Sequence, residues 1–432
     1  MAVTELTHQA VHPAVVPVGP PGIASTTAAA EINLAAFRAN LAAIKQRVGA
    51  SEVMVVVKAD GYGHGMLACA REARAAGAGW LGVATPAEAL ALREAGDTGR
   101  VLAWLYGPDE DITPLVAADV DVSAQSTQQL SRLVAGAATA ERRARVHLKI
   151  DTGLSRNGAA ARDWPELCAA AAEAVRAGAL EVVGVWSHFA AADEPGHPSV
   201  PIQLAAFQRA YEQARAVGLE PALRHLGNSA GALVVPEARF DLVRVGIAAY
   251  GIDPAPGIAA RAGVELRPVM TLRAQLANVK QIEPGAGVSY GWTWRAQEQT
   301  VVGLVPLGYA DGIPRHASDV GHVGWRGSQV PVRGRICMDQ FVVELGRDAD
   351  AAVGDEVIVF GPGDQGEPTA EDWARWCGTI GYEIVTRLGA RVPRIHLAGS
   401  GGSSPRTDTA RGGSGGSSPR TDTTRGATGA PS

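Results

Sequence analysis

The sequence predicts an α/β fold, in which an N-terminal (β/α)8 barrel of the TIM type is followed by a mostly β C-terminal domain. The first part alternates short apolar runs with Ala-rich helical patterns, which is typical of buried parallel strands connected by helices. After about residue 265 the pattern changes to strands separated by Gly and Pro turns. The chain has 432 residues, of which 46% are hydrophobic, and this length suits two domains. We expect the barrel at residues 29–265 and the β domain at residues 266–397.

Two terminal segments are expected to lie outside these domains. Residues 1–28 are rich in proline and small residues without helical or strand periodicity, which indicates a disordered extension. Residues 398–432 consist mostly of Gly, Ser, Thr, Pro and Arg, and SGGSSPRTDTARGG at 400–413 recurs almost unchanged at 414–427. This composition predicts a disordered tandem-repeat tail, a solvated linker without a phosphate-binding loop.

Eight short apolar runs are the candidate strands of the barrel. They lie near residues 53–57, 80–85, 101–106, 119–123, 145–150, 180–187, 223–226 and 242–245. Segments such as EINLAAFRANLAAIKQ, PAEALALREAG and IQLAAFQRAYEQARAVG place apolar residues at three- and four-residue spacing, as amphipathic helices do. Eight such units favour a closed barrel, and a doubly wound open sheet is the alternative.

The composition favours a soluble, cytoplasmic protein that acts on small molecules. The formal net charge of −5 creates no strongly basic field of the kind that nucleic acids or anionic membranes attract. The four cysteines are scattered without a C-x-x-C pair, which argues against a disulfide framework and a structural zinc site. No apolar run is long enough for a transmembrane helix, and the N-terminus lacks the pattern of a secretory signal. We therefore expect no nucleic-acid partner, no membrane partner and no metal.

Polar residues stand at or shortly after the ends of several of the candidate strands. They are Lys58, Arg156, His188, Asn228, Ser229 and Arg244. Active sites of barrels are built at the C-terminal ends of the strands, so these side chains are expected to share one rim. Among them, Lys58 ends the run VMVVV and begins K-A-D-G-Y-G-H-G. Burial there should lower its pKa and make the amine nucleophilic toward an aldehyde such as that of pyridoxal 5'-phosphate (PLP), although this motif alone is also compatible with an ordinary lysine at a strand end.

The segment VVVKADGYGHG resembles the cofactor-lysine segment of alanine racemases. Further segments resemble that family in the same order along the chain, from about residue 30 to residue 397. They are KIDTGLSRNG, SHFA, HLGNSAG, VRVGIAAYG, VSYG and GRICMDQ. The resemblance implies a PLP-dependent amino acid racemase with a barrel, a C-terminal β domain and a homodimer that shares its active sites.

Racemisation requires that a proton leave one face of the α-carbon and return to the other, so two acid/base groups must flank the substrate. The resemblance implies that Lys58 works on the face of the D-enantiomer and Tyr290, contributed by the other subunit, on the face of the L-enantiomer. An ordinary tyrosine titrates near pH ~10, so Tyr290 needs positive charge or hydrogen-bond donors near it. His188 is the candidate for that neighbour.

The resemblance also assigns the groups that hold the cofactor and the substrate. Arg244 would face the pyridine nitrogen, where a guanidinium can only donate hydrogen bonds; this favours a racemase over an aminotransferase. The phosphate would be bound by Ser229, Tyr62, Tyr382 and the backbone around Gly246 and Ile247, next to Asn228.

Further residues are assigned to the substrate side of the site. Arg156 would contact the phenolic oxygen of the cofactor and the substrate carboxylate, and Met338 would offer its backbone N–H to that carboxylate. Lys149 matches a lysine that can be carbamylated in this family. Asp339 lies beside the carboxylate site in the sequence, and Tyr309 and Arg315 would line the route by which substrate enters.

Three other functions remain compatible with these residues. A racemase of broader amino acid specificity would differ mainly in the volume of its pocket, and we expect alanine because a tyrosine-lined pocket should exclude longer side chains. A decarboxylase of this fold type would need an acidic partner for the pyridine nitrogen, where Arg244 stands. A PLP-binding barrel protein without turnover would lack the C-terminal domain. The resemblance implies an enzyme that interconverts L-alanine and D-alanine and supplies D-alanine for peptidoglycan in the cell wall.

Overall fold

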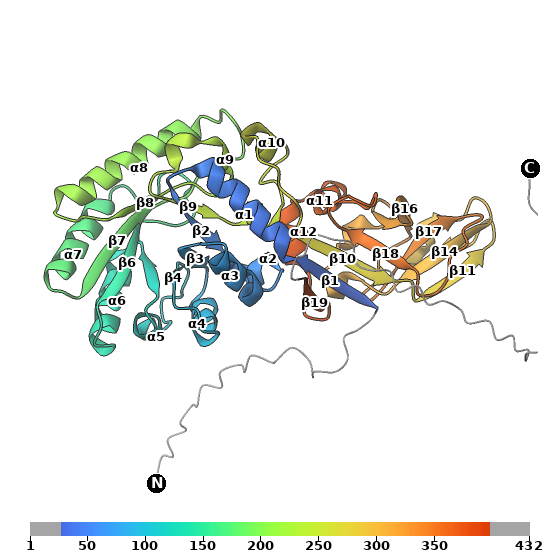
Figure 1. The fold of residues 1–432 in the computed structure, drawn as a ribbon, viewed down its shortest axis with the longest axis horizontal. Coiled ribbons are helices and arrows are strands. Elements are labelled where there is room, and N and C mark those ends of the chain that lie inside the picture. The colour runs from blue at the N-terminus through green and yellow to red at the C-terminus, as the bar shows by residue number, and fades with distance from the viewer. Residues whose placement is uncertain (1–26, 398–432) are drawn as a thin grey trace, which may run out of the picture. The chain divides into compact units, whose positions relative to one another are not determined.

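A computed structural model describes residues 27–397 of the chain. Most of the predicted N-terminal extension and the whole predicted repeat tail lie outside the described residues. Between residues 27 and 397 the chain forms one eight-stranded parallel sheet with surrounding helices and one nine-stranded, mostly antiparallel sheet (Figure 1). The predicted fold class is confirmed.

The parallel sheet has the strand order β8-β7-β6-β5-β4-β3-β2-β9. Its strands are β2 (Glu52–Val56), β3 (Trp80–Val83), β4 (Arg100–Ala103), β5 (Asp121–Ala124), β6 (Ala144–Lys149), β7 (Leu180–Trp186), β8 (Leu223–His225) and β9 (Leu242–Val245). The two ends of the sheet meet, because the backbone N–H groups of Asp241 and Arg244 donate to the carbonyl oxygens of Arg224 (3.3 Å) and Gly227 (2.9 Å). The sheet is therefore a nearly closed barrel, and the alternative of an open doubly wound sheet is wrong.

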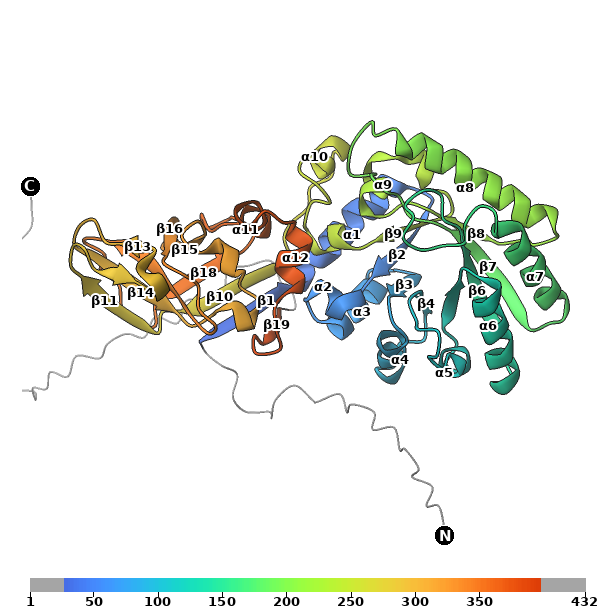
Figure 2. The ribbon, with the colours of Figure 1, turned by 180° about the vertical axis from the view of Figure 1, so that it is seen from behind.

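The helices of the barrel lie outside its strands, as the opposite view also shows (Figure 2). They are α1 (Leu34–Val48), α2 (Lys58–Tyr62), α3 (Met66–Ala75), α4 (Pro86–Glu94), α5 (Thr113–Ala117), α6 (Thr127–Thr139), α7 (Trp164–Arg176), α8 (Ser199–Ala216), α9 (Ser229–Val234), α10 (Ile258–Ala262) and the 3-10 helices η1 (Pro236–Ala238) and η2 (Ile247–Tyr250). Side-chain caps fix several of their starts. Asn33 accepts from the Ala36 N–H at the start of α1, and Thr85 and Glu88 form a capping box at the start of α4.

The nine-stranded sheet has the order β11-β14-β17-β16-β15-β18-β10-β1-β19. Its strands are β1 (Ala28–Asn33), β10 (Met270–Gln275), β11 (Asn278–Ile282), β14 (Thr300–Val305), β15 (His322–Trp325), β16 (Ser328–Arg333), β17 (Phe341–Gly346), β18 (Glu356–Phe360) and β19 (Arg394–Leu397). A small hairpin and short helices complete this part: β12 (Gly287–Val288), β13 (Trp294–Arg295), α11 (Ala370–Cys377), α12 (Gly381–Thr386), η3 (Tyr290–Trp292), η4 (Tyr309–Asp311) and η5 (Arg315–Ala317).

Strand β1 precedes the barrel in the sequence but belongs to the second sheet. It pairs antiparallel with β10, where Ala30 faces Leu272, and parallel with β19, where Ala30 faces Arg394. We expected residues 29–33 in the barrel domain and a helix from residue 31, whereas the helix begins only at Leu34. The physical reason is a partner strand more than 240 positions later in the chain, which local periodicity does not reveal.

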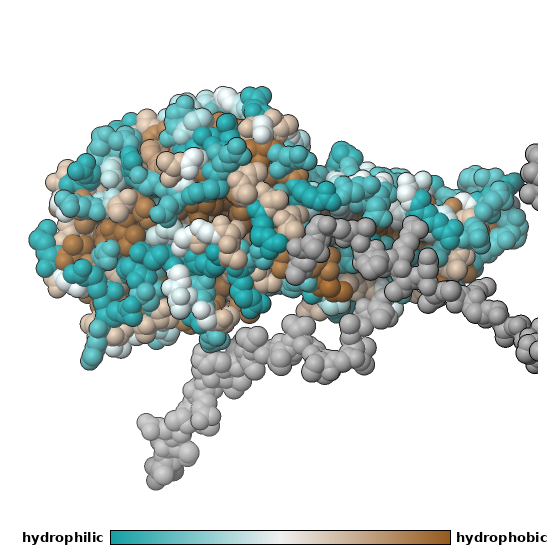
Figure 3. Space-filling view, viewed as in Figure 1, coloured by the Kyte–Doolittle hydropathy of each residue, from teal (hydrophilic) through white to brown (hydrophobic). Residues whose placement is uncertain are grey.

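Apolar and polar side chains together fill the interior of the barrel. One apolar cluster, Met54, Trp80, Leu102, Val183 and Leu242, is separate from the main hydrophobic core of the chain. Buried polar side chains share the interior with it, among them Asp121, His147, His225 and Arg244. No helix within residues 27–397 combines the length and the apolar character needed to cross a lipid bilayer. On the face drawn in Figure 3, hydrophilic side chains predominate between smaller apolar areas.

Candidate active site

A cavity of about 490 Å³ opens at the C-terminal ends of the barrel strands. Its lining includes every residue that the sequence assigned to the cofactor, together with Lys149. These residues are Lys58, Tyr62, Lys149, Arg156, His188, Asn228, Ser229, Arg244, Gly246, Ile247 and Tyr382. The structure therefore brings these side chains to one place, as the strand-end positions predicted. All but Tyr382 come from the barrel, and Tyr382 is contributed by α12 of the second domain.

Lys58 begins a turn of unusual backbone conformation. Ala59, Asp60, Gly61 and Tyr62 all have left-handed φ values, between 52° and 62°, so α2 is a left-handed turn. Such a conformation costs a residue other than glycine roughly 1–2 kcal/mol. Two carboxylates offset this cost: Glu88 accepts a hydrogen bond from the Ala59 N–H (2.7 Å), and Asp60 accepts one from the Met66 N–H (2.8 Å).

The amine of Lys58 lies in a desolvated and positively charged environment. Burial lowers its pKa, and the charges of Arg156 and Arg244 lower it further, while Glu88 acts in the opposite direction. Its Nζ atom lies 5.9 Å from the centroid of the Trp104 ring. This environment favours the neutral amine, the form that attacks an aldehyde or accepts a proton.

Ser229, Gly246 and Tyr62 form a small polar cup in the cavity. The Ser229 hydroxyl accepts a hydrogen bond from the Gly246 N–H (3.0 Å), and a Cβ atom at residue 246 would overlap the hydroxyl of Tyr62. Tyr62 in turn packs against Tyr382, with ring centroids 6.4 Å apart. Helices α9 and η2 start here, and the N–H groups of a first helical turn lack intrahelical partners. Hydroxyls and N–H groups at helix starts of this kind suit a phosphate.

Arg244 is buried under the cavity and is held by backbone carbonyl groups instead of a carboxylate. Its Nη1 atom donates to the carbonyl oxygen of His225 (2.8 Å), and its Nη2 atom donates to those of Ser187 (2.8 Å) and Leu226 (3.2 Å). Burial lowers its pKa to about 9, so the guanidinium still carries its charge at neutral pH.

His188 and Lys149 lie beside this guanidinium. The Nδ1 atom of His188 is 3.2 Å from Arg244 Nη2, and the Lys149 Nζ atom lies 4.1 Å from the centroid of the Trp186 ring. Burial and then the charge of Arg244 lower both pKa values, to about 7 for Lys149 and about 2 for His188. His188 is therefore a neutral imidazole whose Nδ1 accepts from Arg244, and it supplies no positive charge of its own.

The cavity carries an excess of positive charge. Lysines and arginines line it at four positions, Lys58, Lys149, Arg156 and Arg244, and within residues 27–397 no aspartate or glutamate lines it. The buried Oδ1 atom of Asn157, in the same wall, has no hydrogen-bond partner in that part of the chain. A ligand with a phosphate and a carboxylate matches the four positive charges, whereas the Asn157 Oδ1 atom can only accept a hydrogen bond.

A second group of predicted site residues lies outside the cavity, on the surface of the β domain. Tyr290 is 70% exposed and Met338 is 53% exposed. Hydrogen bonds connect their loops: the Ser289 hydroxyl donates to the Arg335 carbonyl (2.6 Å), and the Ala310 N–H donates to the Met338 carbonyl (2.9 Å). The loops therefore form one surface, and within a single chain Tyr290 does not share a cavity with Lys58 or His188.

Two further residues assigned to the substrate route belong to the same part of the β domain. Tyr309 is 42% exposed, and its N–H donates to the Cys337 carbonyl (3.0 Å). Asp339 pairs with Arg391 (2.8 Å), which also binds the buried Asp311. Arg315 lies in η5, between η4 and β15. None of these residues lines the barrel cavity.

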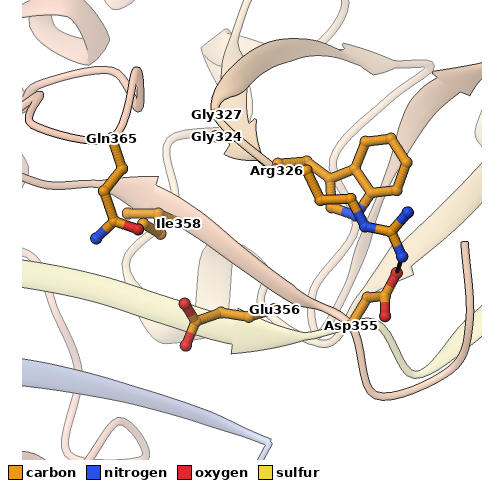
Figure 4. A pocket seen from close by; sticks show the side chains of 8 residues that line it. Gly324, Arg326, Gly327, Asp355, Glu356, Ile358 and Gln365 are labelled. Atoms are coloured by element: carbon orange, nitrogen blue, oxygen red, sulfur yellow. Dashed lines mark hydrogen bonds and ion pairs between the residues drawn. The ribbon is translucent and has the colours of Figure 1, made fainter. Parts of the chain in front are cut away.

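Another cavity, of about 220 Å³, is lined only by strands and loops of the second domain (Figure 4). Glycines and the ion pair between Arg326 and Asp355 (3.0 Å) line much of it, together with Glu356 and Gln365. It shares no residue with the barrel cavity, contains no lysine, and brings no nucleophile to an acid/base partner. The barrel cavity is therefore the candidate active site. No cluster of His, Cys, Asp or Glu within residues 27–397 is arranged to hold a metal ion.

Two long regions of the chain match models of known protein domains. Residues 32–254 match the N-terminal domain of alanine racemase, and residues 269–396 match its C-terminal domain. The chain belongs to the alanine racemase family. Enzymes of this family are PLP-dependent isomerases, and the predicted family is thereby confirmed.

Alanine racemases from actinobacteria are similar to the chain over most of their length. The alanine racemase of Frankia casuarinae is 52% identical over 368 residues, which cover 85% of this chain and 96% of the relative. That of Streptomyces coelicolor is 53% identical over 375 residues, or 86% of this chain and 96% of the relative. The crystal structure of alanine racemase from Streptomyces lavendulae matches with a TM-score of 0.84 and 51% identity, covering 87% of this chain and 98% of that one.

Two tryptophans and a glutamate belong to the candidate site and were missed by the sequence analysis. Trp104 and Trp186 line the cavity at the ends of β4 and β7, and Glu88 supports the turn after Lys58. The tryptophans stand at strand ends like the residues that were predicted, so their positions carried a usable signal. Glu88 lies within a capping box, which by itself predicted only the start of a helix.

Proposed function

We propose that the chain is a cytoplasmic, homodimeric enzyme that interconverts L-alanine and D-alanine, with PLP in the barrel cavity and two bases, Lys58 and Tyr290 of the partner subunit. The observation that carries this proposal is the separation of the two bases within one chain. Lys58 lies in the cavity, whereas Tyr290 is 70% exposed on the second domain. A second copy of the chain is needed to bring the tyrosine to the lysine.

The residues present fit PLP. Ser229, Tyr62, Tyr382 and the N–H groups near Gly246 and Ile247 would bind the phosphate, and Arg244 would donate to the pyridine nitrogen. Lys58 would hold the aldehyde carbon. When bound, the cofactor supplies an electrophilic ring that makes the α-proton of an attached amino acid acidic. An arginine that keeps its proton limits how far the ring can accept electrons, which favours return of the proton over oxidation of the substrate.

The two bases act on opposite faces of the α-carbon. Burial and Arg156 lower the pKa of Lys58, which favours the neutral amine that would take a proton on one face. The phenolic oxygen of Tyr290 of the partner subunit would take or give the proton on the other face. His188 accepts from Arg244 at Nδ1, so its Nε2–H would be free to donate to that phenolic oxygen.

The remaining groups would orient the substrate. Arg156 and the backbone N–H of Met338 of the partner subunit would bind the carboxylate. A carbamate on Lys149 would replace its positive charge with a negative one beside the other three cations, and would fix the direction of Arg156. Tyr62 and Tyr382 line the cavity, and Tyr290 of the partner subunit would approach it, so the pocket should admit the methyl side chain of alanine and reject larger ones. The product D-alanine would serve peptidoglycan synthesis.

The test is the loss of optical rotation from pure L-alanine and, separately, from pure D-alanine, with the PLP-loaded enzyme. We expect both enantiomers to converge on a racemic mixture, and Lys58→Ala to abolish the change. Arginine and lysine should be racemised far more slowly than alanine. Comparable rates for these amino acids would favour a broad-specificity racemase, and an unchanged rotation with cofactor bound would overturn the proposal.

A further inference from the structure

A line of hydrogen bonds crosses the interior of the barrel below the candidate active site. Arg244 Nη1 lies 3.3 Å from His225 Nδ1, His225 Nε2 lies 2.9 Å from His147 Nδ1, and His147 Nε2 lies 3.3 Å from Asp121 Oδ2. The members come from β9, β8, β6 and β5 in turn. Arg244 lines the cavity, whereas Asp121 is the first residue of β5, so the line ends near the N-terminal end of the barrel.

Only one direction of donation is consistent along this line. Arg244 can only donate, so the Nδ1 atom of His225 must carry a lone pair, and its proton must lie on Nε2. That proton is donated to Nδ1 of His147, whose own proton must then lie on Nε2. The carboxylate of Asp121 accepts this last proton. Both histidines are thereby neutral and have the same tautomer, and burial, the largest cause, lowers the pKa of each.

Asp121 is suited to fix this direction. Its side chain is fully buried, and it pairs with Arg145 through one oxygen and with Arg100 (Nε to Oδ2, 3.1 Å) through the other. Burial opposes its charge, but the hydrogen bond from His147 and the two arginines hold its pKa below the usual range. A carboxylate that stays ionised accepts hydrogen bonds and cannot donate one to His147.

The surroundings hold both imidazole rings in this line. Trp186 stacks on His225 with an angle of 4° between the ring planes, and Trp80 meets the His147 ring edge-on. The Trp186 indole is itself fixed by a hydrogen bond to the Ser123 hydroxyl (2.9 Å). A Cβ atom at Gly184 would lie 2.8 Å from His147 Nδ1, so a glycine at this position of β7 makes room for the ring.

We propose that Asp121 is a positioning residue for Arg244: through His147 and His225 it sets the tautomer that turns a lone pair, and not a proton, toward the guanidinium. With the opposite tautomer, an N–H of His225 would face an N–H of Arg244, and the guanidinium would have to move. In the present arrangement, backbone carbonyl oxygens and imidazole nitrogens accept hydrogen bonds from Nη1 and Nη2 of Arg244. Within residues 27–397, the Nε–H of Arg244 has no hydrogen-bond partner. This inference rests on the proposed function in one respect: the Nε–H of Arg244 would donate to the pyridine nitrogen of the cofactor.

The first test is the histidine tautomers themselves, observed by ¹⁵N NMR of the PLP-loaded enzyme with labelled histidine, with His147→Phe and His225→Phe to assign the signals. We expect both histidines to be neutral, with the proton on Nε2, and to remain so from pH 6 to pH 9. A proton on Nδ1 of His225 would overturn the proposal. This measurement does not depend on catalysis, so it fails separately from the proposed function.

The second test compares Asp121→Asn with Asp119→Asn. Asp119 also pairs with Arg145 but does not contact His147, so it controls for the loss of one carboxylate at this end of the barrel. Asp121→Asn should give an Nδ1–H signal for His225 and lower kcat roughly five- to tenfold with little change in KM, whereas Asp119→Asn should change neither. If Asp121→Asn does not fold, His147→Phe, which keeps both ion pairs of Asp121, should lower kcat to a similar extent. Unchanged tautomers and unchanged kcat in the folded variant would overturn the proposal.

Discussion

The hydroxyl of Tyr62 occupies the space that a side chain at residue 246 would need. Gly246→Ala should therefore push Tyr62 away from the Ser229 hydroxyl and disturb the proposed phosphate site. The loss of one hydrogen bond to a charged group costs about 1.5–3 kcal/mol, so the Kd for PLP should rise roughly tenfold or more. Titration of the apoenzyme with PLP, followed by fluorescence, measures this change. Gly107→Ala is the control, because no atom lies closer than 4.0 Å to its added Cβ; an equal effect of both substitutions would argue against the phosphate site.

The separation of Lys58 from Tyr290 predicts complementation between two inactive variants. Lys58→Ala and Tyr290→Phe homodimers should each lose nearly all racemase activity. If the sites are shared, a hybrid dimer has one site that lacks both groups and one that is intact. Random exchange of equal amounts should then restore about a quarter of the activity of the unmodified enzyme. No recovery, despite hybrids demonstrated by native mass spectrometry, would show that both bases come from one chain.

The low pKa of Lys149 predicts that this lysine carries a carbamate at mildly alkaline pH. Only a neutral amine adds CO2, forming an N–C bond and releasing one proton. Burial and Arg244 lower the pKa of Lys149 from 10.5 to about 7, so about nine in ten of its side chains are neutral at pH 8. Carbamate formation should therefore rise as pH increases through about 7 and should fall below it.

The measurement is ¹³C NMR of the enzyme in ¹³C-labelled bicarbonate. Lys149→Arg keeps a positive charge but cannot form the carbamate, so it should remove the signal. Lys280→Arg, at an exposed lysine of β11, should keep it. A signal that persists in Lys149→Arg would assign the modification to another lysine.

The left-handed turn after Lys58 predicts that Glu88 stabilises the fold. Its carboxylate accepts from the N–H groups of Ala59 (2.7 Å), Ala84 (2.9 Å) and Thr85 (3.1 Å). Glu88→Gln replaces one accepting oxygen with an NH2 group that faces backbone donors, so the free energy of unfolding should fall by about 1–3 kcal/mol. Urea denaturation measures the change. Glu94→Gln, at the exposed end of the same helix, should leave it unchanged, and an equal effect there would indicate a general charge effect.

Much of the barrel and of its rim could be predicted from the sequence, because both follow from the pattern of residues in short segments of the chain. Each of the eight strands lies within a few residues of its predicted range, and Lys58 and Arg244 reach one cavity because parallel strands end at the same edge. The assignments of Tyr382 and Tyr290 required the family resemblance, since no local pattern places a residue of the second domain at the barrel.

What could not be predicted depends on contacts between distant positions. The strand β1 was not predicted: its residues were placed in the barrel domain, with a helix from residue 31, because its partner strands follow the whole barrel in the sequence. The line from Asp121 to Arg244 was missed for a related reason. In the sequence, His147 and His225 are ordinary residues of apolar strands. Only the curvature of the barrel brings Nδ1 of His147 to 2.9 Å from Nε2 of His225.

Because β1 lies between β10 and β19, the chain must hold its first strand without a partner while the barrel is synthesised. Arg273 of β10, which binds Glu31 of β1, follows it by 242 positions. At the usual speed of translation this is on the order of ten seconds or more. The eight strands of the barrel have all been synthesised by residue 245, whereas the nine-stranded sheet can close only after β19 (Arg394–Leu397) has been synthesised. Assembly of the proposed shared active sites would thereby wait until residue 397 of each polypeptide has been synthesised.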